Sequence, residues 1–351
     1  MFTAVRHRRH RVMAAQSGTV GYYVHHHGAG HAARFTKIKQ ASDQNIVPIS
    51  ELPFPGGVQL PTDVVSDGSD PTAGGALHWA PVGAAGSANR SLVLGWWLTE
   101  NRPSGVVVDV SVEATLMCRL FGIPTIVMRQ HGNRSDPAHE AAFRSARRLI
   151  APFPKELEHG STPAWVRQKT MYAGFIVDDP SPRPHTQEAQ DTPGRNDIVV
   201  LWGAGGGALT TADLTGIVAA AGDVPVWFAG ARPRDLDTDR VRHLGWVDDV
   251  GDLLRNGPTV VGSAGNNVVA DAAATGCALV VVPQDRPFGE QDVHAESLGA
   301  AQAAAVVSRG SARNWQNAFE LARARRHNLA VLAGDLDGAS NAASCIDSSL
   351  N

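Results

Sequence analysis

The chain has 351 residues, of which 43% are apolar and 19% charged, a length and composition that suit two or three globular domains and exclude a disordered protein. The formal net charge of -3 excludes a general nucleic-acid binder, which needs a basic excess to neutralise phosphates. Three cysteines without metal-ligand spacing exclude a disulfide scaffold and a zinc motif, and no run of about 18 apolar residues is present to span a membrane.

The first predicted unit is a strand that runs through a glycine-rich turn into a helix. Residues 19–27 (TVGYYVHHH) are β-rich, and Gly28-Ala-Gly30-His31 follows them directly. This order of elements opens a doubly wound α/β domain. Further buried strands of the same half are predicted at 46–49, 91–96, 105–110 and 125–129.

The second half of the chain opens in the same way. A strand at 197–202 leads into Gly203-Ala-Gly205-Gly206-Gly207, and a helix is predicted over 211–221. Both loops fit Gly-x-Gly-x-x-Ala, and they start 175 residues apart, at 28 and 203. Further strands are predicted at 224–229, 258–262 and 278–282. The repeat predicts an α/β fold of two doubly wound, Rossmann-like domains.

The parts outside these units are predicted to be connections and ends. Residues 178–196 contain four prolines among polar residues and are expected to link the domains. Residues 52–86 are rich in glycine, proline and acids, which indicates a long functional or mobile loop. A helix is expected over 314–332, followed by a polar tail, and the first 12 residues are expected to form an appended arm.

A third small-residue turn lies between the strand at 258–262 and a helix that carries Asp271. Ala264, Gly265, Asn266 and Asn267 would direct backbone N–H groups at an anion. Asp271 is a polar residue in an otherwise apolar helix, so its carboxylate suits the role of accepting hydrogen bonds from ribose or sugar hydroxyls. The plainer alternative is that Asp271 lies on a solvated face of the helix.

Two further groups follow the strand at 278–282. Glu290 and Gln291 lie beyond its carboxyl end, where ligands bind in open sheets.

An NAD-dependent oxidoreductase also remains open as an alternative function, because Glu51 nearly supplies the acid that a dinucleotide fingerprint requires after the first loop.

Several segments resemble glycosyltransferase family 28, the group of the peptidoglycan lipid II N-acetylglucosaminyltransferase. The segments that carry the resemblance are GSAGNNVVADAAATG at 262–276, EQDVHA at 290–295, HGAGH at 27–31, the end of the first half at 105–134, and YAGF at 172–175. The resemblance implies the GT-B fold, in which two doubly wound domains face each other across a cleft. It assigns residues 13–177 to an acceptor-binding domain, 178–196 to a linker and 197–335 to a nucleotide-sugar-binding domain.

The resemblance also implies a donor site in the second domain. Gly203, Gly205, Gly206 and Gly207 would line the diphosphate together with Ala264, Gly265, Asn266 and Asn267. Backbone atoms at Trp246 and Val247 would hold the base. Asp271 stands where the family has an acid on the ribose, usually a Glu that is one methylene longer. Glu290 and Gln291 match the pair that reads the donor sugar, and the first of them departs from the usual Gln or Asp.

Catalysis of such a transfer needs a base for the acceptor hydroxyl and positive potential for the leaving diphosphate. His31 is the expected base, because it opens a helix at the cleft, and a purely diphosphate-binding role is the alternative. Asp109, at the end of the strand at 105–110, would orient or activate the acceptor, and Glu113 is a weaker candidate. The remaining acceptor-side or diphosphate residues are expected to be Gly28, Gly30 and Gln130.

No resident cofactor and no metal site are expected, although a divalent cation could assist the diphosphate. The Asp-x-Asp pairs at 235–237 and 335–337, and the strand histidines His25 and His27, are interpreted as solvated or core groups. The expected partners are a UDP-sugar and an unknown, for example lipid-linked, acceptor, with no nucleic acid. The expected location is cytoplasmic, at most peripheral at the inner face of the cytoplasmic membrane.

The leading hypothesis is therefore an inverting hexosyl- or N-acetylhexosaminyltransferase of cell-envelope or glycoconjugate biosynthesis. A nucleotide-sugar epimerase of the same fold, the NAD-dependent oxidoreductase and a non-catalytic nucleotide binder remain as alternatives.

Overall fold

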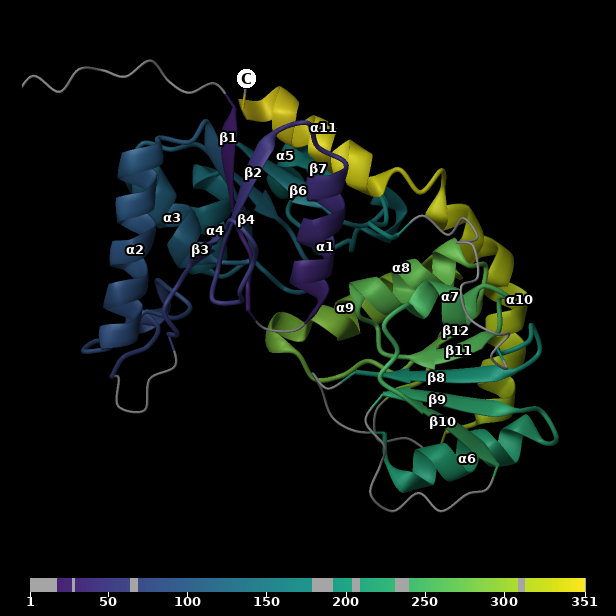
Figure 1. The fold of residues 1–351 in the computed structure, drawn as a ribbon. Coiled ribbons are helices and arrows are strands. Elements are labelled where there is room, and N and C mark those ends of the chain that lie inside the picture. The colour runs from purple at the N-terminus through teal and green to yellow at the C-terminus, as the bar shows by residue number, and fades with distance from the viewer. Residues whose placement is uncertain are drawn as a thin grey trace, which may run out of the picture.

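A computed structural model describes residues 18–26, 29–63, 69–178, 192–203, 209–230, 240–308 and 313–350. These parts of the chain form two parallel β-sheets, each packed between helices (Figure 1). The two bodies follow each other along the chain, as the colours of Figure 1 show.

The first sheet has the strand order β3-β2-β1-β4-β5-β6-β7, and all of its neighbouring strands are parallel. Its strands are β1 (Thr19–Tyr23), β2 (Asn45–Ser50), β3 (Val58–Gln59), β4 (Gly105–Asp109), β5 (Thr125–Met128), β6 (Arg148–Ala151) and β7 (Thr170–Tyr172). Its helices are α1 (Ala29–Gln40), α2 (Ala85–Asn101), α3 (Val112–Leu120), α4 (Pro137–Ser145) and α5 (Ala164–Lys169). The buried runs of Val, Ile and Leu in these strands match a sheet covered on both faces.

The second sheet has the strand order β10-β9-β8-β11-β12-β13, again all parallel. Its strands are β8 (Ile198–Trp202), β9 (Val226–Gly230), β10 (Val241–Gly245), β11 (Thr259–Gly262), β12 (Ala278–Val281) and β13 (Ala305–Val306). Its helices are α6 (Thr211–Ala221), α7 (Val250–Leu254), α8 (Asn266–Ala274), α9 (Glu290–Ala300) and α10 (Trp315–Ala333). The helix predicted over 211–221 is confirmed, with a capping box between Thr210 and Asp213 at its start.

The two sheets share one winding pattern, which confirms the predicted repeat. In each, the first strand of the unit lies between the second and the fourth: β1 between β2 and β4, and β8 between β9 and β11. The direction of winding reverses at this point, and ligands of open α/β sheets bind beyond the carboxyl ends of the strands there. The fold therefore offers two such switch points, one in each body.

The prediction of a strand at 91–96 is wrong, because these residues lie in the middle of α2. Leu94 and Trp97 are buried, whereas Leu92 and Trp96 are 70% and 63% exposed. The apolar residues therefore divide between two helix faces, and a short apolar run does not by itself distinguish a strand from a helix.

The expectation of a polar tail after residue 332 is also wrong. The chain forms the helix α11 (Gly338–Leu350), which lies along the first body, against α1 and β6 (Figure 1). Ala342, Cys345 and Ile346 on one face of α11 join the core of the first sheet. Gly338 makes the approach possible, since a methyl group there would lie 2.1 Å from the carbonyl oxygen of Phe175. The division into domains at 177, 197 and 335 stays a prediction.

Candidate active site

The switch point of the first sheet brings His31 and Asp109 together. Asp109 is the last residue of β4, and His31 is in the first turn of α1, which follows the neighbouring strand β1. The Nδ1 atom of His31 lies 3.0 Å from Oδ1 of Asp109. Asp109 is fully buried, while the His31 side chain keeps 19% of its surface exposed. A buried carboxylate thus holds one ring nitrogen of a histidine whose ring remains partly exposed.

Arg34 completes this pair from one turn further along α1. Its Nε donates to Oδ2 of Asp109 at 3.0 Å and its Nη2 donates to Oδ1 at 2.9 Å. The hydroxyl of Tyr22 also donates to Oδ2, at 3.5 Å. Burial favours the neutral acid, but the charges of Arg34 and His31 outweigh it and hold the pKa of Asp109 well below its usual range. Asp109 is therefore a carboxylate near neutral pH.

Gln130 determines which His31 nitrogen carries a proton. With its amide oxygen facing Arg34, Gln130 accepts hydrogen bonds from Nη2 at 2.7 Å and from Nη1 at 3.2 Å. Nη2 has two hydrogens, which this arrangement directs to Gln130 and Asp109. Nδ1 of His31 lies 2.9 Å from Nη2 but then has no hydrogen to accept, so it carries its own proton and donates to Asp109. The lone pair of His31 is consequently on Nε2.

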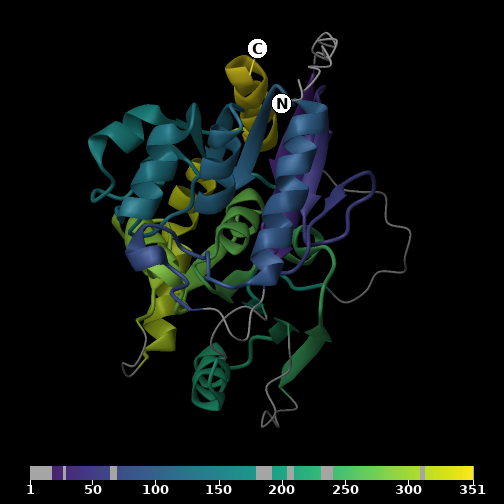
Figure 2. The same cartoon turned by 90° about the vertical axis from the view of Figure 1, so that its left-hand side faces the viewer.

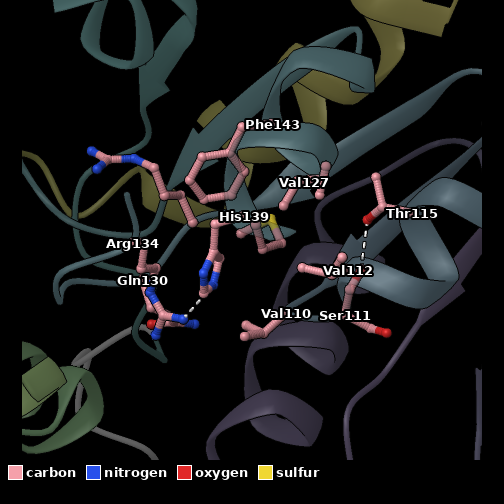
Figure 3. A pocket seen from close by; sticks show the side chains of 12 residues that line it. Val110, Ser111, Val112, Thr115, Val127, Gln130, Arg134, His139 and Phe143 are labelled. Atoms are coloured by element: carbon pink, nitrogen blue, oxygen red, sulfur yellow. Dashed lines mark hydrogen bonds between the residues drawn. The ribbon is translucent and has the colours of Figure 1, made fainter. Parts of the chain in front are cut away.

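Backbone strain and a small cavity adjoin this pair. Val110, directly after Asp109, has a φ of +69°, a conformation that a β-branched residue rarely adopts. Val110 lines a cavity between the ends of β4 and β5 and the helices α3 and α4 (Figure 3). Val112 and Phe143 make its walls apolar, while Gln130 and His139 add polar groups.

The switch point of the second sheet offers backbone groups instead of an ion-pair network. β11 ends at Gly262, and the turn Ser263-Ala264-Gly265 leads into α8. Gly265 is the N-cap of α8 and provides no side-chain cap, so the first N–H groups of the helix remain available to an anion. His294, buried in α9, has its Nδ1 2.8 Å from the carbonyl oxygen of Ala264, which fixes the turn.

The two switch points face each other. A methyl group on Gly30, at the start of α1, would lie 3.5 Å from the side-chain nitrogen of Asn267, at the start of α8. The side-chain amides of Gln130 and Asn266 are 2.5 Å apart. Two helix N-termini thus converge on the same space, which places positive potential from both bodies there. His31 lies at the edge of that space.

Asp271 is a half-buried carboxylate in α8. Among the residues that the structure describes, none donates a hydrogen bond to its side chain. Burial raises its pKa to about 6, against the opposing effect of Lys37 on α1 and with the support of Asp178 and Asp249. A carboxylate in this state has free acceptor capacity, as an acid that binds ribose hydroxyls requires.

The predicted sugar-reading pair begins α9, where a loop was expected. Glu290 accepts a hydrogen bond from Nη2 of Arg134 at 2.8 Å, which is a contact between the two bodies. Gln291 is only 4% exposed, and its oxygen accepts from the backbone N–H of Gln284 at 2.8 Å. Glu290 is therefore the more accessible of the two, and Gln291 supports the loop after β12.

The remaining predicted donor residues are only partly described. Trp246 is 64% exposed, and Val247 packs against the core beside it. Gly203 follows β8 at the switch point. Gly28, Gly205, Gly206 and Gly207 lie outside the described residues, as do His27 and Asp235.

A cluster of His78, Asp136 and His139 has the residue types of a metal site. Asp136 contacts Nε2 of His78 at 2.9 Å and Nδ1 of His139 at 2.5 Å. The other nitrogen of His139, Nε2, lies 3.0 Å from Nη1 of Arg134. A metal-bound histidine normally directs its second nitrogen at an acceptor, whereas this one faces a donor, so the cluster fits a hydrogen-bonded network better than a metal.

Two arginines of the site, Arg34 and Arg134, were not predicted. Arg34 is three residues after His31, the spacing that places two side chains on one helix face, so that spacing was the available signal. Arg134 comes from a loop, and no periodic pattern marks it.

Comparisons with known proteins agree with this architecture. Residues 228–320 match the model of the glycosyltransferase family 28 C-terminal domain. A UDP-N-acetylglucosamine--N-acetylmuramyl-(pentapeptide) pyrophosphoryl-undecaprenol N-acetylglucosamine transferase of Rubrobacter xylanophilus is 32% identical over 242 residues, which cover 61% of this chain and 68% of that protein.

Solved structures resemble the whole fold. The glycotransferase of kitacinnamycin has a TM-score of 0.67 and 16% identity, covering 96% of this chain and 100% of its own. MurG of Acinetobacter baumannii has a TM-score of 0.64 and 13% identity, with 94% and 99% coverage. The fold and its facing switch points define a GT-B glycosyltransferase. The chain belongs to glycosyltransferase family 28.

Membership of this family decides against the oxidoreductase alternative. Glu51, the acid that raised it, instead accepts a hydrogen bond from Nη1 of Arg90 at 3.2 Å. None of the helices in the described parts of the chain has the length and apolar character needed to cross a bilayer.

Proposed function

We propose that the chain transfers a sugar from a UDP-sugar, N-acetylglucosamine being the first candidate, to a hydroxyl group of a lipid-linked acceptor, with inversion at the anomeric carbon. The donor and acceptor classes follow from the name of the Rubrobacter xylanophilus relative. The observation that supports the chemistry most strongly is the pair of His31 and Asp109 beside two converging helix N-termini.

In this proposal His31 is the general base. Asp109 holds the proton on Nδ1, so Nε2 takes the proton of the acceptor hydroxyl as its oxygen attacks the anomeric carbon. The bond from that carbon to the diphosphate breaks in the same displacement, and its electron pair leaves with the diphosphate. Asp109 stabilises the resulting imidazolium, as the buried acid does in a Ser-His-Asp triad.

The leaving diphosphate would bind at the start of α8. The N–H groups of Asn266 and Asn267, in the first turn of α8, and the positive end of the helix favour its negative charge. The proposed reaction needs no resident cofactor, because these groups supply the positive potential. Activity would then persist in a chelator such as EDTA.

The remaining donor groups follow the family resemblance. Asp271 would accept hydrogen bonds from the ribose hydroxyls, Glu290 from a sugar hydroxyl, and the backbone at Trp246 and Val247 would hold the uracil. Gln291 would act by fixing the loop at Gln284.

The acceptor would approach from the first body, where the cavity beside Val110 lies. Contact with a membrane surface is supported by the exposed side chains of Leu92 and Trp96 on α2, of Leu120 at the end of α3 and of Phe121 directly after it. Gly95 of α2 packs close to Phe121, so the two groups adjoin. Figure 2 shows α2 in front of the first sheet. Exposed apolar side chains on adjoining helices suit a lipid surface.

The test is a thermal-shift panel of nucleotides followed by product analysis. A ligand that binds only the native state raises the apparent stability, so UDP and one UDP-sugar should raise the melting temperature and NAD should not. Transfer to an acceptor would support the proposal. Conversion of the sugar without any acceptor would contradict it and favour the epimerase of the same fold.

A further inference from the structure

The two bodies are joined beside Glu290 by two short segments, residues 132–134 of the first body and 288–290 of the second. We name these six residues the interdomain latch. The backbone N–H of Asn133 donates to the carbonyl oxygen of Phe288 at 2.7 Å, and Nη2 of Arg134 donates to Oε2 of Glu290 at 2.8 Å. The latch therefore ends on the residue assigned to the donor sugar.

Each nitrogen of the Arg134 guanidinium has a different partner. Nε donates to the carbonyl oxygen of His131 at 2.9 Å, Nη1 lies 3.0 Å from Nε2 of His139, and Nη2 binds Glu290. The Phe288 ring lies against the guanidinium, 5.2 Å away, and the Arg134 side chain is only 7% exposed. Arg134 is thus fixed in one orientation.

His139 can pair with Arg134 only by accepting a hydrogen bond, because a guanidinium has no acceptor atom. The groups around His139 keep its ring in the form that accepts one. Burial, assisted by the charge of Arg134, lowers the pKa of His139 to about 4, so the ring is neutral near pH 7. The Nδ1–H of His139 donates to Oδ2 of Asp136, and Nε2 of His78 contacts the other oxygen of Asp136. The lone pair on Nε2 therefore faces Arg134.

The backbone of the latch also depends on close approach. Gly132 has a φ of +111°, and a methyl group there would lie 2.9 Å from the Phe288 carbonyl oxygen and 3.2 Å from Cα of Glu290. Phe288 and Gly289 have φ values of +62° and +61°, which turn the chain sharply before α9 begins at Glu290. Phe288 thus keeps a positive φ, which is uncommon for a residue other than glycine, at the contact between the two bodies.

We propose that Arg134 is a positioning residue for the donor sugar. It occupies Oε2 of Glu290 and leaves Oε1 as the acceptor for one sugar hydroxyl, so the acceptor-binding body takes part in selecting the sugar. This inference rests on the proposed function. Among the described residues, Arg134 alone hydrogen-bonds the Glu290 carboxylate. Without Arg134 the carboxylate can rotate and offer either oxygen to water or to sugars of different stereochemistry.

The test compares Arg134→Ala and Arg134→Lys with a control variant on α9, the helix that carries Glu290. Glu296, in α9, pairs with His159 of the first body at 3.2 Å, so Glu296→Ala also removes a contact between the bodies, away from the latch. The measurements are kcat/KM for UDP-N-acetylglucosamine and for its C4 epimer UDP-N-acetylgalactosamine, and Kd for UDP alone.

Arg134→Ala should lower kcat/KM for the preferred donor at least about tenfold, which corresponds to ~1.4 kcal/mol. It should also bring the kcat/KM values of the two donors closer to each other. UDP affinity should stay unchanged, because UDP lacks the transferred sugar that Glu290 would contact. Glu290→Ala added to Arg134→Ala should cost little more, since coupled residues are not additive. Arg134→Lys should restore part of the discrimination, and Glu296→Ala should leave it intact.

Equal loss of discrimination in Arg134→Ala and Glu296→Ala would overturn the inference, as would a loss of UDP affinity that matches the loss of kcat/KM. Unchanged discrimination in Arg134→Ala would also overturn it while leaving the proposed function in place. If the wild-type chain uses no UDP-sugar as a donor, the proposed function itself fails, and the role of Glu290 fails with it.

Discussion

The two switch points have the same topology and opposite chemistry. At the first, charged side chains form a network around the fully buried Asp109, and every group in it has a partner. At the second, the start of α8 offers backbone N–H groups without a side-chain cap, and Asp271 has unused acceptor capacity. One sheet pattern thus supports a rigid site that handles a proton and an open site prepared for an anion.

The difference lies in what each point must do before a ligand arrives. A general base needs a defined tautomer, which requires fixed partners on the nitrogen that does not react. A nucleotide site needs unsatisfied donors and acceptors, which the ligand then satisfies. The side-chain amides of Gln130 and Asn266 lie 2.5 Å apart, so the rigid network adjoins the start of the open site.

The largest expected effect is on the rigid site. Asp109→Asn should destabilise the fold by ~3–5 kcal/mol at pH 7, because it leaves Arg34 buried without its carboxylate. Urea unfolding measures this. Arg34→Met added to Asp109→Asn should recover much of the loss, because the unpaired charge is removed; no recovery would show that the pair is not the source of the effect.

The same variant also tests the pH dependence of stability. The folded pKa of Asp109 is depressed below its unfolded value, so its contribution is present above about pH 4 and declines as the pH falls below that value. The difference in unfolding free energy between wild type and Asp109→Asn should therefore shrink in acid. A difference that is the same at pH 7 and pH 3 would refute the assignment.

The open site should respond through ligand affinity. Asp271→Ala should weaken UDP binding by ~1.5–3 kcal/mol, the value of a hydrogen bond to a charged group. Calorimetry with 2′-deoxy-UDP provides the control: its affinity should differ less between wild type and variant, because one ribose hydroxyl is missing. Equal losses for both nucleotides would mean that Asp271 acts through the fold.

Asp271 should also show the opposite sign of pH dependence from Asp109. Its folded pKa is raised to about 6, so its charged form opposes folding, and the wild type loses stability as the pH rises through 6. Asp271→Asn should raise the melting temperature at pH 8 but not at pH 4. A lower melting temperature at pH 8 would show that the carboxylate has a stabilising partner.

The smallest expected effect concerns the membrane. Leu92→Ser with Trp96→Ser should weaken binding to anionic liposomes in a salt-insensitive way, because the two side chains are exposed and apolar. Removal of the basic residues at 6–11 should reduce only the salt-sensitive part, by ~1 kcal/mol per charge at most. Full binding by both variants would contradict peripheral attachment at these places.

The sequence predicted the repeat because its signals are local. A strand at 197–202 and a helix over 211–221 each depend on a few adjacent residues, and the structure confirms both, while most of the glycine-rich turn between them lies outside the described residues. Asp109 could be placed at a strand end for the same reason. The prediction of a strand at 91–96 is wrong because the composition of a short apolar run does not decide between helix and strand. The segments that pack against the run decide it.

The parts that could not be predicted depend on contacts between distant segments. The helix α11 packs against α1, about 300 residues earlier; the Ser, Asn and Asp residues of α11 give it a polar composition, although its apolar residues gather on one face. The pairing of Arg134 with Glu290 joins residues 156 positions apart. The proton position on His31 follows from Arg34 and Gln130, which only the fold brings together.

In the proposed mechanism the two switch points divide the reaction: His31 moves the proton, and the start of α8 binds the diphosphate. Measuring kcat for transfer and Kd for UDP in His31→Ala tests this division. We expect kcat to fall by ~10²–10⁴, the usual contribution of a general base, with an unchanged Kd for UDP. A Kd that weakens as much as kcat falls would contradict the division and make His31 a ligand of the diphosphate.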